Sequence, residues 1–182
     1  MISIAFGLLL AAAPAPTPAC DIPVAIRKNL LVQDWETFDQ SPQGFRALVD
    51  DKLHCQRAAG EIIAAYLDVH PELSVKQRYV SEFHAGQMFA GADDTRRALR
   101  HFYRGFNPDE DPHGSGKWNA YVRATIAFLE KDRPTLEASL AVLEQHQDNR
   151  MNAINIRLVK GFVAEFGASY AAAVNAAWPE DD

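Results

Sequence analysis

Apolar residues recur along this chain at intervals of three and four positions, the spacing that one buried face of an α-helix requires. The clearest example lies between Cys55 and Val69 and stops at His70-Pro71. Its apolar stripe consists of Ala58, Ala59, Ile62, Ile63, Tyr66 and Leu67. No stretch of useful length alternates apolar and polar residues in the way that a half-buried β-strand does. The pattern therefore predicts an all-α protein.

Capping residues, glycines and prolines divide the rest of the body into further helices. Ser41-Pro42 predicts a helix start, because serine is a good N-cap and proline is tolerated in the first turn. Apolar residues follow this start at helical spacing: Phe45, Leu48, Val49 and Leu53. The same pattern predicts helices over residues 74–90, 94–106, 118–131, 135–147, 149–166 and 168–178. Residues 107–116 form the longest irregular stretch between them.

The expected helices form pairs about every 30 to 40 residues, which is typical of helical-repeat arrays. Small and aromatic residues stand at fixed spacings in the pair over residues 74–106, and a proline follows: Ala85-Gly86, Phe89, Ala98, Phe102 and Pro108. This pattern resembles the tetratricopeptide repeat, in which small residues let two helices approach and aromatic residues fill the space beside them. Glu82 stands where the family has a tryptophan. The neighbouring pairs fit more loosely, and the resemblance covers roughly residues 41–147.

The resemblance implies a right-handed superhelical stack of about three antiparallel helix pairs, with residues 149–178 as C-terminal capping helices. In this family the first helix of each pair lines a concave groove that binds proteins or peptides. The groove residues implied for this chain are Phe83, His84 and Gln87 in the second pair, and Asn119 and Arg123 in the third. The partner expected on this basis is an unidentified protein or peptide.

The first nineteen residues carry no charged side chain. The apolar run from Ile2 to Ala13 has the length of an export signal and is too short to span a bilayer. Cleavage after Ala19 is preferred, because earlier small-residue positions would leave proline next to the cut. We expect an exported chain, periplasmic or secreted, without a transmembrane segment after cleavage. The expected divisions are a signal peptide (1–19), an N-terminal segment (20–40), a helical-repeat domain (41–178) and an acidic tail (179–182).

Cys20 and Cys55 are the only cysteines of the sequence. In an oxidising compartment they are expected to form a disulfide that pins the N-terminal segment to the body. Cys20 would also begin the mature chain, and Thr17-Pro18-Ala19-Cys20 faintly resembles the lipobox of bacterial lipoproteins. Two alternatives therefore stay open, namely a lipoprotein anchored through Cys20 and a pair of free thiols.

The formal net charge of −6 disfavours nucleic acid as a partner, since phosphate binding needs a concentrated face of Lys and Arg. A local exception is a stripe of arginines at fourfold spacing, Arg96, Arg100 and Arg104. Such a stripe is usually a solvated helix face, and otherwise a docking surface for an acidic partner.

The six histidines are the first candidates for catalysis or metal binding. None of them stands in a His-Glu-x-x-His arrangement, and no serine lies in a Gly-x-Ser-x-Gly turn. His84 and His101 lie on paired helices and can approach each other, with Glu82 or Asp94 beside them. Residues 109–113 gather oxygen ligands but lack the fixed positions of an EF-hand loop.

The leading hypothesis is a non-enzymatic, exported scaffold of the bacterial envelope that binds a protein or peptide without a cofactor or metal. One alternative is a metal-dependent enzyme or accessory factor that uses the histidines and residues 109–113. Another is a lipid-anchored subunit of an envelope assembly.

Overall fold

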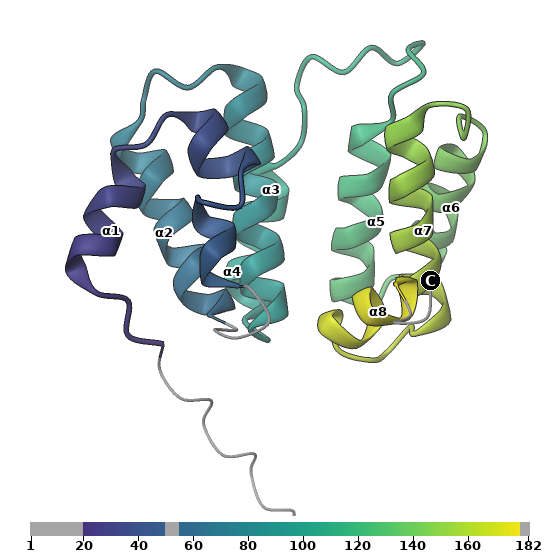
Figure 1. The fold of residues 1–182 in the computed structure, drawn as a ribbon. Coiled ribbons are helices and arrows are strands. Elements are labelled where there is room, and N and C mark those ends of the chain that lie inside the picture. The colour runs from purple at the N-terminus through teal and green to yellow at the C-terminus, as the bar shows by residue number, and fades with distance from the viewer. Residues whose placement is uncertain (1–19, 50–54, 179–182) are drawn as a thin grey trace, which may run out of the picture.

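A computed structural model describes residues 20–49 and 55–178 of the chain (Figure 1). All regular secondary structure in these residues is helical, which confirms the all-α prediction. The elements in chain order are α1 (Val24–Leu31), a π-helical turn η1 (Glu36–Gln40), a 3₁₀ turn η2 (Phe45–Leu48), α2 (Gln56–Val69), α3 (Val75–Gly91), α4 (Thr95–Arg104), α5 (Trp118–Glu130), α6 (Arg133–Glu144), α7 (Arg150–Ala164) and α8 (Tyr170–Ala177).

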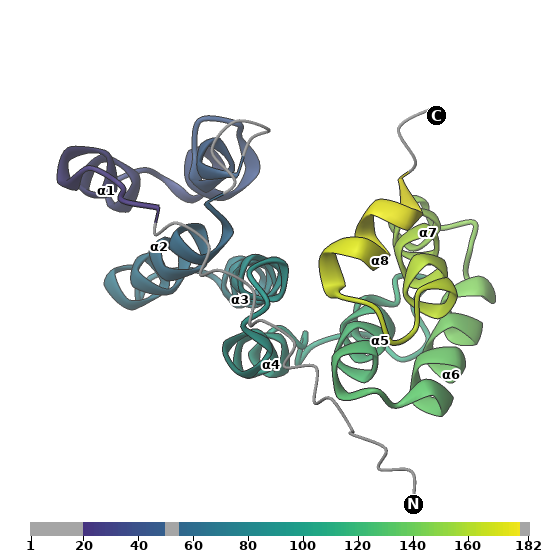
Figure 2. The same cartoon turned by 90° about the horizontal axis from the view of Figure 1, so that it is seen from below.

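The helices form two groups, α1–α4 and α5–α8, which the loop 105–117 joins (Figure 1). Helices that are neighbours in sequence pack against each other, as α2 does on α3, α3 on α4, α5 on α6 and α7 on α8. Viewed from below, α1 to α4 follow one another in a row, whereas α5 to α8 form a compact group (Figure 2). The two groups touch where α4 meets α5 and where α3 meets α8.

Two apolar clusters hold these groups together, and α3 contributes to both. The first cluster joins the N-terminal segment and η2 to α2, and its large members include Phe38, Phe45, Ile62, Ile63 and Tyr66. The second cluster runs from α3 to α8, and its large members include Phe83, Phe89, Phe102, Phe128 and Phe162. Ala85 of α3 lies in the first cluster, while its neighbour Phe83 lies in the second. Helix α3 is therefore a wall that both halves share, and this position decides where the candidate site lies.

Side-chain caps fix several helix starts where the sequence predicts them. The Ser74 hydroxyl accepts from the N–H of Gln77, and the Gln77 side chain accepts in turn from the Ser74 N–H, which makes a capping box. Asp94, Asp132 and Asn149 cap α4, α6 and α7 with a side-chain oxygen that accepts from backbone N–H groups of the first turn. The helices expected from Cys55 onwards are confirmed, with ends that differ by a few residues.

The prediction of a helix that begins at Ser41 is wrong. The chain forms η1 before Ser41 and η2 after it, and the Ser41 hydroxyl donates to the carbonyl of Thr37 at 2.6 Å. Ser41 therefore closes the preceding turn instead of opening an α-helix. Gly44 permits this tight path, because a Cβ atom there would collide with the carbonyl oxygen of Phe38. Leu53, the last residue of the expected helix stripe, lies outside the described residues.

Cys20 and Cys55 form a disulfide with Cα atoms 5.6 Å apart, which confirms the expected pairing. The bond ties the N-terminal segment to the start of α2 across a sequence separation of 35. The expected signal peptide, its cleavage position and the acidic tail lie outside the described residues. Of the helices in the described part of the chain, none is long and apolar enough to cross a membrane.

Candidate functional site

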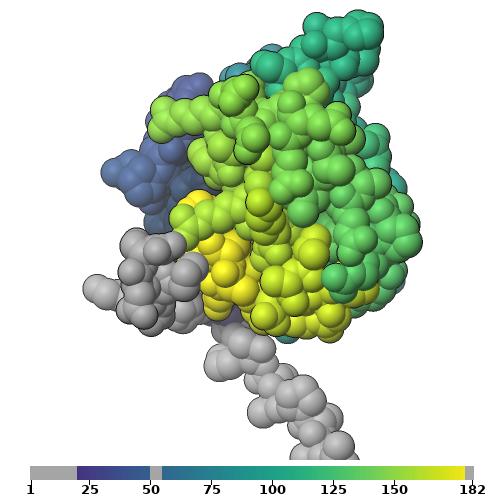
Figure 3. Space-filling model, turned by 90° about the vertical axis from the view of Figure 1, so that its right-hand side faces the viewer, coloured from purple at the N-terminus to yellow at the C-terminus, as the bar shows by residue number. Residues whose placement is uncertain are grey.

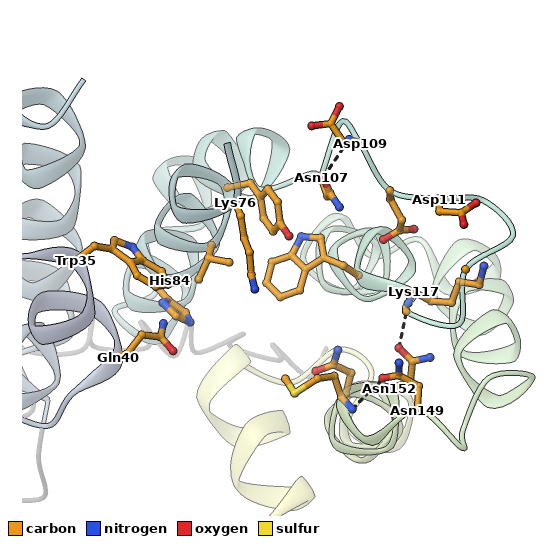
Figure 4. A pocket seen from close by; sticks show the side chains of 18 of the residues that line it. Trp35, Gln40, Lys76, His84, Asn107, Asp109, Asp111, Lys117, Asn149 and Asn152 are labelled. Atoms are coloured by element: carbon orange, nitrogen blue, oxygen red, sulfur yellow. Dashed lines mark hydrogen bonds between the residues drawn. The ribbon is translucent and has the colours of Figure 1, made fainter. Parts of the chain in front are cut away.

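A cavity of about 690 Å³ opens between the two helix groups (Figure 4). We call it the groove. Its lining consists of Trp35, Glu36, Gln40, Arg46, Lys76, Tyr79, Val80, His84, Asn107, Asp109, Glu110, Asp111, Gly114, Gly116, Lys117, Trp118, Asn149, Met151, Asn152 and Asn155. These residues come from the N-terminal segment, η2, α3, the loop 105–117, the start of α5 and the first two turns of α7 with its cap. The volume lies in the range of about 300–1,000 Å³ that is usual for ligand sites.

Aromatic side chains from three parts of the chain form much of the groove wall. Tyr79 of α3 and Trp118 of α5 lie with their ring centroids 5.4 Å apart. The indole N–H of Trp118 donates to the carbonyl of Gly105 at 2.7 Å, and that of Trp35 donates to the Ser81 hydroxyl at 3.0 Å. These hydrogen bonds hold both indole rings in place, so the groove offers fixed apolar surfaces.

Asn119 of α5 holds the loop wall in position. Its side-chain amide donates to the carbonyl of Asn107 at 2.8 Å and accepts from the N–H of Asn107 at 2.7 Å. The backbone N–H of Asn119 donates to the Glu110 carboxylate at 2.7 Å.

Burial raises the pKa of Tyr79, and the negative charge of Glu110 raises it further, so the phenol remains a hydrogen-bond donor at neutral pH. The loop projects beyond the helices of the C-terminal group in the space-filling view (Figure 3).

Two asparagines of α7 line the groove, and their side-chain amides differ in whether they already have hydrogen-bond partners. Asn152 accepts from the N–H of Lys117 at 3.1 Å and donates to the carbonyls of Ser115 and His146 at 2.8 and 2.9 Å. Asn155 is 6% exposed, and its side-chain amide has no hydrogen-bond partner among the described residues. An amide both donates and accepts, so Asn155 can satisfy a polar group of a bound ligand.

At the other end of the groove, the His84 ring contacts the buried carboxylate of Asp39. Asp39 of η1 is 0% exposed and lies 3.0 Å from His84 Nδ1. The Ser81 hydroxyl donates to Asp39 at 3.1 Å, and the Gln40 amide donates to it at 2.5 Å. Three polar partners therefore compensate the desolvation of this carboxylate. His84 and Gln40 lie side by side in the close view (Figure 4).

The five groove residues that the family resemblance implies differ in where the structure places them. His84 lines the groove. Phe83 is 1% exposed and packs in the core, with ring centroids 4.9 Å from those of Phe102 and Trp118. The prediction that Phe83 faces a partner is therefore wrong, because helix α3 turns this side chain toward α4 and α5.

The remaining three implied residues also lie outside the groove lining. The side chain of Gln87 hydrogen-bonds to the buried phenols of Tyr121 and Tyr170. Burial raises the pKa of both phenols, and the Gln87 hydrogen bond opposes this effect. Asn119 uses its amide to hold the loop, as described above, and Arg123 is exposed.

Trp35, Asp39 and Asn155 belong to the site, although none of the sequence patterns above predicts them. The cysteine pair predicts a tether for the N-terminal segment, but Leu31, Trp35 and Phe38 recur there at intervals of four and three residues. This spacing is the signal that would have assigned the segment to the core. Nothing in the sequence distinguishes Asn155 from Asn152, the other asparagine of the same helix.

The arginine stripe lies on α4 as expected, and Arg96, Arg100 and Arg104 are exposed. Arg104 approaches Glu82 at 3.9 Å. Arg97, which the stripe does not include, instead pairs with Asp94 at 2.7 Å. The role of the stripe as a docking surface for an acidic partner stays a prediction.

His84 and His101 do not form a common site. His101 Nδ1 lies 2.6 Å from the Glu82 carboxylate inside the α3–α4 hairpin, whereas His84 turns to Asp39 on the opposite side of α3. Asp94 pairs with arginines instead. Within the described residues, no group of at least three His, Cys, Asp or Glu side chains is placed to hold a metal ion.

Comparison with protein-family models, with curated proteins and with solved structures found no match to this chain.

Proposed function

We propose that this chain is a non-enzymatic binding protein that holds an extended segment of another protein or peptide in the groove. The observation that carries the proposal is the lining, where the fixed rings of Trp35, Tyr79 and Trp118 stand with side-chain amides. Rigid aromatic rings bind apolar side chains at a low cost in conformational entropy. The free amide of Asn155 suits a main-chain N–H or carbonyl group. A peptide offers both kinds of group along its length.

The placement of the helices supports a tetratricopeptide-like stack as the origin of the groove. Helices α3 and α5 are the first members of the second and third expected pairs, and both line the groove together with α7. Gly86 and Phe102 make the close contact between α3 and α4 that the resemblance implies. We therefore propose a right-handed superhelical arrangement of repeats in which α7 and α8 form the C-terminal cap.

Export is part of the same proposal. The Cys20–Cys55 disulfide supports an oxidising compartment, because disulfides persist in secreted and periplasmic proteins and are rare in the cytosol. A lipid anchor on Cys20 would need the sulfur atom that this disulfide uses. We accordingly favour a periplasmic or secreted protein over a lipoprotein.

The test uses two exposed apolar residues of α7. Met151 is 58% exposed and lines the groove, whereas Ile154 is 38% exposed and lies outside it. The probe is the tightest peptide selected against the protein from a displayed library of random dodecapeptides. Met151→Glu should weaken its binding by about tenfold or more, because a charge replaces an apolar contact. Ile154→Glu should leave the affinity within about twofold. Equal effects of the two substitutions would contradict the proposal.

A further inference from the structure

The hydrogen bonds around Asp39 determine which nitrogen of His84 carries the proton. Trp35 donates its indole N–H to the Ser81 oxygen at 3.0 Å, so the Ser81 hydroxyl hydrogen is free to point at Asp39, 3.1 Å away. Gln40 donates its amide N–H to the same carboxylate at 2.5 Å. A carboxylate only accepts hydrogen bonds, so His84 Nδ1, 3.0 Å away, must donate. Neutral His84 therefore keeps its hydrogen on Nδ1 and its lone pair on Nε2.

The second ring nitrogen of His84, Nε2, is available to a ligand in the groove. The side chain is 17% exposed and lines the groove, and Nε2 has no hydrogen-bond partner among the described residues. The ring of Phe45, whose centroid is 5.7 Å away, packs beside the imidazole. With Asp39 on one side and Phe45 on another, the ring has a fixed orientation and its acceptor a fixed position.

We propose that His84 Nε2 is the hydrogen-bond acceptor for a main-chain N–H of the peptide in the groove. The inference rests on the proposed function and adds a specific polar contact to it. A peptide N–H that loses water on binding needs an acceptor, since a buried donor without one is costly. The carboxylate behind the ring fixes the tautomer and the orientation of the imidazole, as the outer carboxylate does for histidines that bind metal ions. Asp39 is thus a positioning residue, and His84 is the residue that contacts the ligand.

The first experiment measures the tautomer in the free protein. Long-range ¹H–¹⁵N correlation spectra of the full chain distinguish a protonated from an unprotonated ring nitrogen. We expect neutral His84 to be protonated at Nδ1 alone. His101 provides an internal reference, because its Nδ1 also faces a carboxylate but its ring does not line the groove. A hydrogen on Nε2 of neutral His84 would overturn the inference, whatever the groove binds.

The second experiment couples His84 to the ligand. Each main-chain N–H of the selected dodecapeptide is replaced by N–CH₃, and the affinity of each peptide is measured for the wild type, His84→Leu and His84→Gln. At one position, methylation should weaken binding to the wild type by about tenfold and have almost no effect in His84→Leu. His84→Gln keeps a carbonyl acceptor and should retain part of the coupling. His101→Gln, the control in the same hairpin, should keep all of it.

The two proposals fail in different ways. If Met151→Glu abolishes binding while every methylated peptide loses the same factor in wild type and His84 variants, the groove is correct and the role of His84 is wrong. If Met151→Glu has no effect, the proposed function fails and the role of His84 fails with it. Should His84→Leu not fold, the His84 Nε2 resonance of the wild type decides, because it must shift when the peptide binds and stay unchanged if it accepts no hydrogen bond.

Discussion

The ring of Phe102 on α4 lies directly against the backbone of Gly86 on α3. A Cβ atom at Gly86 would come within 2.7 Å of this ring, which is completely buried. We expect Gly86→Ala to destabilise the fold by about 1–3 kcal/mol, because the ring has no free space to enter. The better helix propensity of alanine, worth about 1 kcal/mol, offsets only part of this cost. Urea unfolding measures the difference.

Gly116 provides the matched control for that substitution. No heavy atom lies within 4 Å of a Cβ built at Gly116, in the loop of the groove. Gly116→Ala should therefore change the free energy of unfolding by less than about 1 kcal/mol. Equal stability of the Gly86→Ala variant and the wild type would show that α3 and α4 do not pack as closely as described.

His70 gives the fold a dependence on pH with a defined sign. Its Nδ1 lies 2.6 Å from the Glu72 carboxylate, and its Nε2 lies 2.9 Å from the carbonyl of Leu31. Burial alone would lower the pKa of His70, but the hydrogen bonds to Glu72 and Leu31 outweigh it, and the pKa is raised. The protonated ring donates to both acceptors at once and joins the end of α1 to the end of α2.

Because the pKa of His70 is higher in the folded state, protonation stabilises the fold. This contribution is complete below the unfolded value of about 6.5 and is lost as the pH rises through the folded value. The loss of unfolding free energy caused by His70→Phe should therefore be larger at about pH 6 than at about pH 9. A loss that is the same at both pH values would contradict the assignment of both acceptors.

Asn152 should be among the most sensitive positions of the groove. Asn152→Ala removes the partner of the Lys117 N–H and of the carbonyls of Ser115 and His146. We expect a loss of about 2–4 kcal/mol and faster hydrogen exchange at the Lys117 amide, because the buried Lys117 N–H loses its acceptor and two partly buried carbonyls lose a donor. Asn175→Ala, at an exposed position of α8, should change stability by less than about 0.5 kcal/mol. Unchanged exchange at Lys117 would exclude this anchoring role.

The Cys20–Cys55 disulfide should contribute a measurable share of the stability. For a closed loop of 35 residues, reduction is expected to cost about 3–4 kcal/mol, since the unfolded chain gains conformational freedom. Cys20→Ser should match the reduced wild type and be insensitive to a reductant. A reductant effect that persists in Cys20→Ser would mean that the stabilisation does not come from this bond.

The helical body could be predicted from the sequence because its signals are local. Ser74, Asp94 and Asn149 are caps whose partners lie two or three residues away, and the apolar spacing of α2 belongs to a single element. The helix predicted to start at Ser41-Pro42 does not form, because a contact that the local pattern does not include competes with it. Gly44 packs its backbone against Phe38, which no local propensity reveals.

The groove could be predicted only as a region. The family resemblance predicts a groove along α3 and α5, and His84 lies there, but Phe83 packs in the core and Asn119 holds the loop. Which face of α3 remains exposed depends on the N-terminal segment, whose Trp35 and Asp39 bond to residues more than forty positions away. Such long-range pairs leave no periodic trace in a single sequence.

The three tryptophans of the sequence test in one spectrum whether a peptide binds in the groove. Trp35 and Trp118 line the groove, whereas Trp178 lies outside it with its ring 4.1 Å from the Arg157 guanidinium. The selected dodecapeptide is titrated into the ¹⁵N-labelled full chain, and the indole N–H signals are followed. We predict that the signals of Trp35 and Trp118 shift with saturation while that of Trp178 stays in place. Saturable binding that moves the Trp178 signal and leaves the other two unchanged would contradict peptide binding in the groove.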